Sequence, residues 1–294
     1  MVVIVVMVLV LAAVPLASAP PTSRMVAWLT AGGQEVSEPT LVAVRAAGQR
    51  IGAVSGVVAA VLAVVLFVAD VDFYLALVGY ALAAVVGAAA PLGGGPRRRA
   101  ELTTARRSGP ARLVGLGVGL AAVTSGSALA LGVQLARASG DRYGVVLTSS
   151  FGMPSVDLRH LVIVGSVSGG VLVVSLLALV FVGRRQTAAG AAPATDVMIR
   201  RWCAHRVQWG LVGAQLMLIG ALAPAVQVLS LRSEGSYGLV GDQGLAAAGS
   251  AVGVALLAAG VVAAAVAVLV PVWVGPRHRM RLTAPRVVAG VGGR

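Results

Sequence analysis

Six polar side chains lie inside otherwise apolar stretches of the chain, and they are the residues with the most scope for ligand contact. They are Thr124, Ser125, Ser127, Ser166, Ser168 and Gln215. Hydroxyl groups can bond to a carbonyl of their own helix, so they cost little in an apolar setting. The amide of Gln215 needs a partner from elsewhere, because an unpaired amide in hydrocarbon is costly. We therefore expect either a hydrogen bond between helices or a small polar cavity lined by these residues.

Residues suited to catalysis or metal binding are sparse. The histidines are His160, His205 and His278, and none lies within a long apolar run. The only close acidic pair, Asp70 and Asp72, is typical of a solvated turn. The glycine-rich stretch 93–96 lacks the lysine that follows in a phosphate-binding loop. We accordingly expect no catalytic residue, no metal ion and no cofactor, and we expect that the chain is not an enzyme.

The composition requires a lipid environment. Hydrophobic residues make up 58% of the 294 residues, charged residues only 11%, and the mean hydropathy is +0.94. A soluble domain is closer to about half apolar and about a quarter charged. The formal net charge is +13, and all 23 basic residues behind it are arginines. The use of arginine in place of lysine is typical of a high-GC bacterial genome. These arginines lie between apolar runs, which indicates a lipid bilayer as the partner and not nucleic acid.

Seven apolar runs define the expected elements. They are 1–19, 51–69, 73–92, 113–136, 161–183, 207–229 and 245–274. The last six contain no charged residue, and about 20 residues suffice to cross a bilayer as a helix. Backbone amides in lipid must be paired within the segment, which favours helices. The prediction is an all-α polytopic transmembrane helix bundle of about seven spans.

The first run admits three interpretations. Residues 17–19 have the small-x-small form of a signal-peptidase site, yet no basic residue precedes the run. If the natural start is Met25, the bundle has six spans. We favour a retained first span or signal-anchor at 1–19, followed by a cytoplasmic linker at 20–50.

Arginine placement predicts the orientation. Sixteen arginines lie in segments 93–112, 184–206 and 275–294, whereas the connections on the other side hold four. Basic loops stay in the cytoplasm. We therefore expect a multi-pass protein of the plasma (inner) membrane with a cytoplasmic basic tail at 275–294 and an extracytoplasmic N-terminus.

The six later spans, 51–274, form three expected hairpins, each entered through a basic stretch. Whether these hairpins are true repeats stays open. Glycines four residues apart recur and favour close helix packing within the bundle or, alternatively, dimerisation. The pairs are Gly52 and Gly56, Gly115 and Gly119, Gly165 and Gly169, and Gly249 and Gly253.

One resemblance concerns the stretch 106–185, which contains ARRSGPARLVGLGVGLAAV and LTSSFGMPSVDLRHL. It resembles the CopD-type copper-resistance membrane domain of actinobacteria. The intramembrane histidines of that family are absent, so no site is carried over. By residue type and spacing alone, Met153 and His160 are candidate copper ligands on the outer side.

These patterns favour a non-catalytic partner or assembly component of a membrane complex. The alternative is a permease or facilitator for a small neutral or lipidic substrate, since ion-coupled carriers usually keep an ionisable residue at membrane depth. CopD-like copper handling is a weaker alternative. A facilitator requires that these six polar residues line a single cavity that is open to water.

Overall fold

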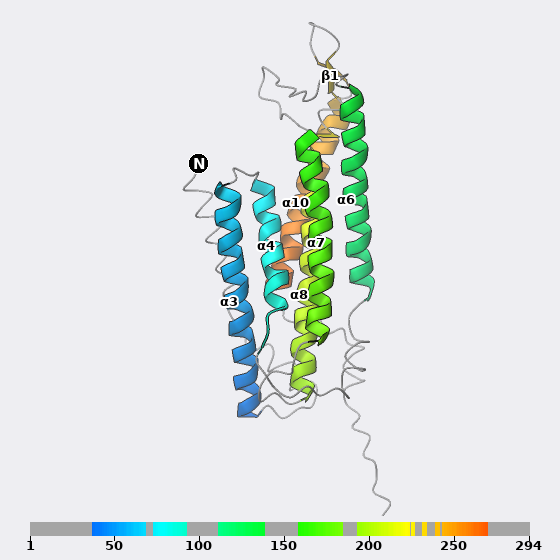
Figure 1. The fold of residues 1–294 in the computed structure, drawn as a ribbon. Helices are drawn as coiled ribbons and strands as arrows, with labels where there is room; N and C mark the ends of the chain where they lie inside the picture. Colours follow the sequence, from blue (N-terminus) through cyan, green and yellow to red (C-terminus); the bar gives the residue numbers. More distant parts are fainter. Residues whose placement is uncertain are drawn as a thin grey trace, which may run out of the picture.

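Six helices make up the bundle in the computed structural model, which describes residues 37–68, 73–92, 111–138, 158–184, 193–223, 225–226, 231–233, 239–241 and 243–269. They are α3 (Glu38–Val68), α4 (Phe73–Ala88), α6 (Ala111–Ala138), α7 (Leu158–Arg184), α8 (Pro193–Gly220) and α10 (Gln243–Leu269). The helices lie alongside one another (Figure 1). A short antiparallel pair, β1 (Leu231–Ser233) and β2 (Leu239–Gly241), lies between α8 and α10. The expected all-helical bundle is confirmed.

Three of the described helices are long and apolar enough to cross a membrane. They contain the candidate spans Glu38–Leu62, Arg112–Ala136 and Leu158–Arg184. Shorter apolar stretches, Leu75–Ala88 and Ala251–Ala267, lie in α4 and α10. The chain is therefore a helical membrane protein, and the total of seven or six spans stays a prediction. The expected first span at 1–19 and the basic tail at 275–294 lie outside the described residues.

Helix α3 begins earlier than the apolar run at residue 51. Ser37 precedes the helix, and its Oγ lies 3.0 Å from the hydroxyl of Thr40. Its carbonyl accepts a bond from the Leu41 amide at 3.2 Å. Serine is a favoured residue before the first turn, and an acidic residue such as Glu38 suits the positive end of the helix dipole. The expected linker at 20–50 is therefore helical from Glu38 onward.

Helix α8 also begins before its apolar run, at Pro193. Proline suits the first helical position because the amide there has no partner within the helix. Asp196 lies in the first turn, where its carboxylate accepts a bond from Arg200 Nε at 2.6 Å. The helix ends at Gly220, ahead of Pro224, instead of continuing to 229. Charged residues placed in a loop by hydropathy thus belong to the helix.

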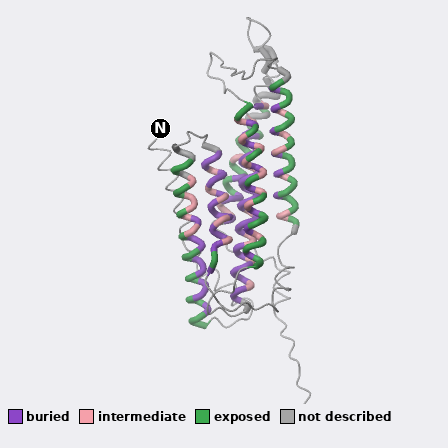
Figure 2. Tube along the Cα trace, viewed as in Figure 1, coloured by how far each residue is buried: buried purple, intermediate pink, exposed green. Residues whose placement is uncertain are grey.

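Helix α8 lies at the centre of the bundle. It packs most extensively on α10 and α4 and also contacts α6 and α7. Several of its large side chains are fully buried, among them Trp202, Arg206, Leu211 and Met217. By contrast, α3, α6 and α7 carry many exposed apolar side chains (Figure 2). Exposed aliphatic faces of this kind suit contact with lipid tails, while α8 supplies the core.

Glycines bring α8 and α10 into backbone contact. A Cβ added to Gly213 would lie 2.8 Å from the carbonyl oxygen of Gly260, and one added to Gly260 would lie 2.7 Å from that of Gly213. Gly220 meets Gly253 in the same way, at 2.8 Å from its carbonyl oxygen. Such close approach is how helices associate without a hydrophobic drive between them.

Two of the four glycine pairs expected from their spacing, those in α6 and α7, make no tight contact with another helix. A Cβ added at Gly115, Gly119 or Gly169 would meet no atom within 4 Å, and one at Gly165 would lie 3.6 Å from the Cβ of Ala128. The expectation of close packing is therefore wrong for Gly115 and Gly119, which lie on an exposed side of α6. Spacing alone does not reveal which side of a helix meets a neighbour.

Candidate functional site

Gln215 of α8 joins three helices. Its Oε1 accepts bonds from Ser168 Oγ of α7 at 2.8 Å and from Thr124 Oγ1 of α6 at 3.3 Å. Its Nε2 donates to the backbone carbonyl of Ser168 at 3.0 Å. All three side chains are fully buried. We call these three residues together with Ser125 the Gln215 network.

The hydroxyl groups of the network also lie near partners other than Gln215: backbone carbonyls of α6 and one another. Thr124 has one hydroxyl proton, which it shares between Gln215 Oε1 and the Leu120 carbonyl, 2.8 Å away and one turn back along α6. Ser168 lies 3.4 Å from the Ala121 carbonyl, and Ser125 donates to Ser168 Oγ at 3.5 Å. Hydrogen bonds to two other helices offset the cost of burying the Gln215 amide in an apolar environment. The arrangement can fix the relative position of α6, α7 and α8.

Two of the six polar residues singled out in the sequence lie apart from this network. Ser166 is exposed on the outer side of α7, and Ser127 is half-buried on α6. Neither has a hydrogen bond to Gln215. The structure thus brings together Thr124, Ser125, Ser168 and Gln215. The helical register separates Ser166 from Ser168, because residues two apart do not share a helix face.

Arg206 of α8 is a second polar centre, which the apolar runs did not predict. Its side chain is 2% exposed. Its Nη2 donates to Ser55 Oγ of α3 at 3.2 Å, and its Nε donates to the Ala84 carbonyl of α4 at 3.3 Å. Both acceptors belong to expected spans. The charge-free bundle interior expected from the apolar runs is therefore wrong, because the long arginine side chain carries its charge inward from the end of the run.

The helices pack closely around Arg206. Its guanidinium carbon lies 5.8 Å from the ring centroid of Trp202, in the range of a cation–π contact. A Cβ added to Gly87 of α4 would collide with Ser55, so the absence of a side chain there lets α3 and α4 approach. The buried residues Met198, Trp202 and Arg206 recur every four positions. That spacing is the sequence signal by which the buried position of Arg206 could have been found.

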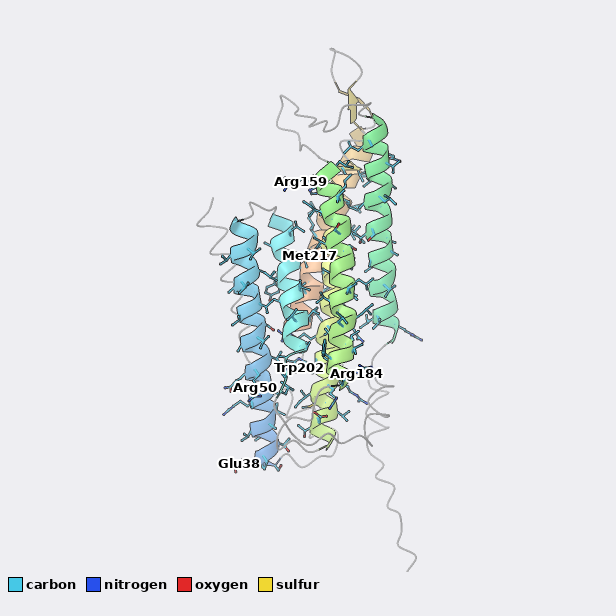
Figure 3. The ribbon with its side chains drawn as sticks, viewed as in Figure 1. Glu38, Arg50, Arg159, Arg184, Trp202 and Met217 are labelled. Carbon is cyan, nitrogen blue, oxygen red and sulfur yellow. The ribbon has the colours of Figure 1, made fainter. Side chains whose placement is uncertain are left out.

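Arg200 performs a related task at the end of α7. Its Nη1 donates to the carbonyls of Val182 at 3.3 Å and Gly183 at 3.0 Å, while Asp196 neutralises it. A cation at a helix C-terminus bonds carbonyls that lack a partner within the helix. Arg50 and Arg184 lie toward the same end of the bundle, whereas Arg159 lies toward the other (Figure 3).

His160, one of the two residues of the expected copper contact, bonds within the bundle. His160 Nε2 donates to the Ala221 carbonyl at 3.1 Å, which ties the start of α7 to the end of α8. Within the described part of the chain, no group of three or more His, Cys, Asp or Glu residues lies close enough to hold a metal ion. Met153, Asp70, Asp72 and His278 lie outside the described residues.

Comparison with known protein families, with curated proteins and with solved structures finds no match for this chain.

Proposed function

We propose that this chain is a non-catalytic partner or assembly component of a membrane complex. The observation that carries the proposal is the closure of the Gln215 network. Gln215 uses both ends of its amide on α6 and α7, and its side chain is fully buried. A facilitator would keep such groups available to its substrate. In this network the polar groups are hydrogen-bonded to one another and to helix carbonyls. This supports a role in holding helices together.

Helix α6 supplies a surface on which a partner helix would pack. Gly115, Gly119 and Gly126 are exposed, and a Cβ added to any of them would meet no atom within 4 Å. The exposed side chains of Leu116 and Val123 lie along the same helix. Small residues one turn apart let a second helix approach closely in the membrane.

The test is co-purification of the tagged protein from its own host in mild detergent, after cross-linking in intact cells. We expect a second membrane protein to co-purify in fixed proportion. Replacing Gly115 and Gly119 together by leucine is expected to abolish that association. Gly170→Leu is the matched control, because Gly170 is an equally open glycine on α7. A native protein that purifies alone, or a double leucine variant that keeps the partner, contradicts the proposal.

A facilitator is the second candidate, and Arg206 is the observation that favours it. Charged residues inside a membrane bundle often mark a substrate path. A guanidinium would select a substrate with an anionic group, in contrast to the neutral or lipidic substrate expected from the sequence.

Complementation of a deletion strain separates the two candidates. For the assembly role, we expect Arg206→Met and Gln215→Leu to complement as well as the native protein does, provided that they accumulate to normal levels. Lost complementation by either well-folded variant would favour the facilitator.

A further inference from the structure

A ridge of small residues runs along α3 at intervals of four positions. Its members are Gly48, Gly52, Gly56 and Ala60. Residues four apart are neighbours on the same side of a helix. Gly48 and Gly52 are buried and Gly56 is half-buried, whereas Ala60 is exposed. We call these four residues the α3 glycine ridge.

Helix α3 lies at one edge of the bundle and meets the other described helices through a different side (Figure 1). Among the described helices it packs mainly on α4 and more sparingly on α8. Ala47 and Ile51 of α3 belong to the buried cluster shared with those two helices. At about 100° per residue, Gly52 is turned by about 140° from Ala47, and Gly56 by the same angle from Ile51.

The burial of the ridge therefore needs a separate cause. A glycine on an open side of a helix is exposed in this bundle: a Cβ added to Gly119 of α6 would meet no atom within 4 Å, and Gly119 is exposed. On α3 itself, Ala53 and Val57 directly follow Gly52 and Gly56, and both are exposed. Burial confined to the ridge, on a side turned from α4 and α8, indicates that a further segment of protein covers it.

The apolar run 1–19 has the place in the chain and the composition to be that segment. The connection 20–37 joins it to the start of α3 and can span up to roughly 60 Å when extended, whereas packed helices lie about 8–10 Å apart. Consecutive elements of a chain are usually adjacent in space. Ala13 and Ala17 are four positions apart, as Gly52 and Gly56 are. Small residues on both helices let the two backbones approach closely.

We infer that the run 1–19 packs antiparallel to α3 along the α3 glycine ridge. Residue numbers fall along one helix as they rise along the other, so the expected pairs are Ala17 with Gly52, Ala13 with Gly56, and Leu9 with Ala60. The ridge is then filled from within the same chain and is closed to a second copy. The exposed glycine side of α6 remains for a partner helix.

Disulfide cross-linking in isolated membranes tests this packing. The variant that combines Ala13→Cys with Gly56→Cys is oxidised, and its monomeric form is digested with trypsin, which cleaves after Arg24 and Arg50. A disulfide keeps residues 1–24 joined to the peptide that begins at Ile51. We expect mass spectrometry to detect this joined peptide, and reduction to separate it.

A second pair and a matched control make the result specific. Leu9→Cys with Ala60→Cys is expected to link in the same way, because it lies two turns of the helices further along the same contact. Ala13→Cys with Gly119→Cys is the control and should give no link, because Gly119 is an open glycine on α6. Native Cys203 is fully buried and can remain in place.

Leucine substitutions test whether the glycines themselves form the contact. Gly56→Leu should abolish the link between Leu9→Cys and Ala60→Cys, because its side chain fills the ridge, whereas Gly119→Leu should leave that link unchanged. Absence of the joined peptide in both cysteine pairs, or equal linking in the Gly119→Cys control, would overturn the proposal. So would links found only between two chains, linking that persists in Gly56→Leu, or a purified chain that lacks residues 1–19.

Discussion

Single polar residues in this bundle are placed so that neighbouring helices satisfy them. Gln215 bonds to α6 and α7, Arg206 to α3 and α4, and Arg200 to the end of α7. All three lie on α8. In an apolar environment an unpaired polar group is costly, so each bond favours the native arrangement over a shifted one. The central helix thus carries the polar groups that position the helices around it.

Replacing Gln215 by leucine tests how much this positioning contributes to stability. After the change, Thr124 keeps its bond to the Leu120 carbonyl, and Ser168 keeps the Ala121 carbonyl within reach. Because no hydroxyl is left unpaired, we expect a loss of about 1 kcal/mol or less. A melting curve in detergent measures it. A loss several times larger would show that Thr124 or Ser168 is left unpaired after the change, contrary to this expectation.

Arg206→Met tests the buried charge. Methionine keeps much of the volume and removes the cost of desolvating the guanidinium, while Ser55 can bond back to its own helix. We expect a melting temperature close to or above that of the native protein. Arg206→Ala, which leaves a cavity beside Trp202, should be less stable than Arg206→Met by about 1–3 kcal/mol. If both variants instead melt at the same temperature, well below that of the native protein, the guanidinium bonds to Ser55 and Ala84 are essential to the fold.

Helix contacts depend on a few glycines whose importance differs by position. At Gly260, an added methyl group would press on the backbone of Gly213, whereas at Gly119 it would meet nothing. We expect Gly260→Ala to destabilise the protein by about 1–3 kcal/mol through overpacking. Gly119→Ala should be neutral or slightly stabilising, because alanine favours a helix by up to about 1 kcal/mol. Equal melting temperatures for the two variants would contradict the α8–α10 packing.

The sequence predicts the elements better than their contacts. Apolar runs are sufficient to predict the helices, because a membrane permits few alternatives. Hydropathy misplaces the starts of α3 and α8, since Ser37 and Pro193 begin helices inside charged segments. The partnership of Thr124, Ser168 and Gln215 depends on the rotation of three helices, which no single stretch of sequence specifies. Arg206 escaped prediction for the same reason: its side chain reaches across to Ser55 and Ala84.

The two ends of the whole bundle differ chemically. Arg184, Arg200 and Arg201 lie around the end of α7, whereas Leu158 and Arg159 begin that helix at the other end. Positive charge near one end of a membrane bundle favours retention of that end in the cytoplasm. We therefore expect α7 to cross the membrane with Arg184 inside and Leu158 outside.

Cysteine labelling at the two ends of α7 tests this expectation most directly. Native Cys203 is fully buried and should not react, so it can remain in place. Leu158 and Arg184 are both exposed, which makes Leu158→Cys and Arg184→Cys a matched pair on one helix. In intact cells, a membrane-impermeant maleimide is expected to label Leu158→Cys only, and Arg184→Cys should react after the membrane is opened. Labelling of both positions in intact cells, or of Arg184→Cys alone, would contradict this orientation of α7.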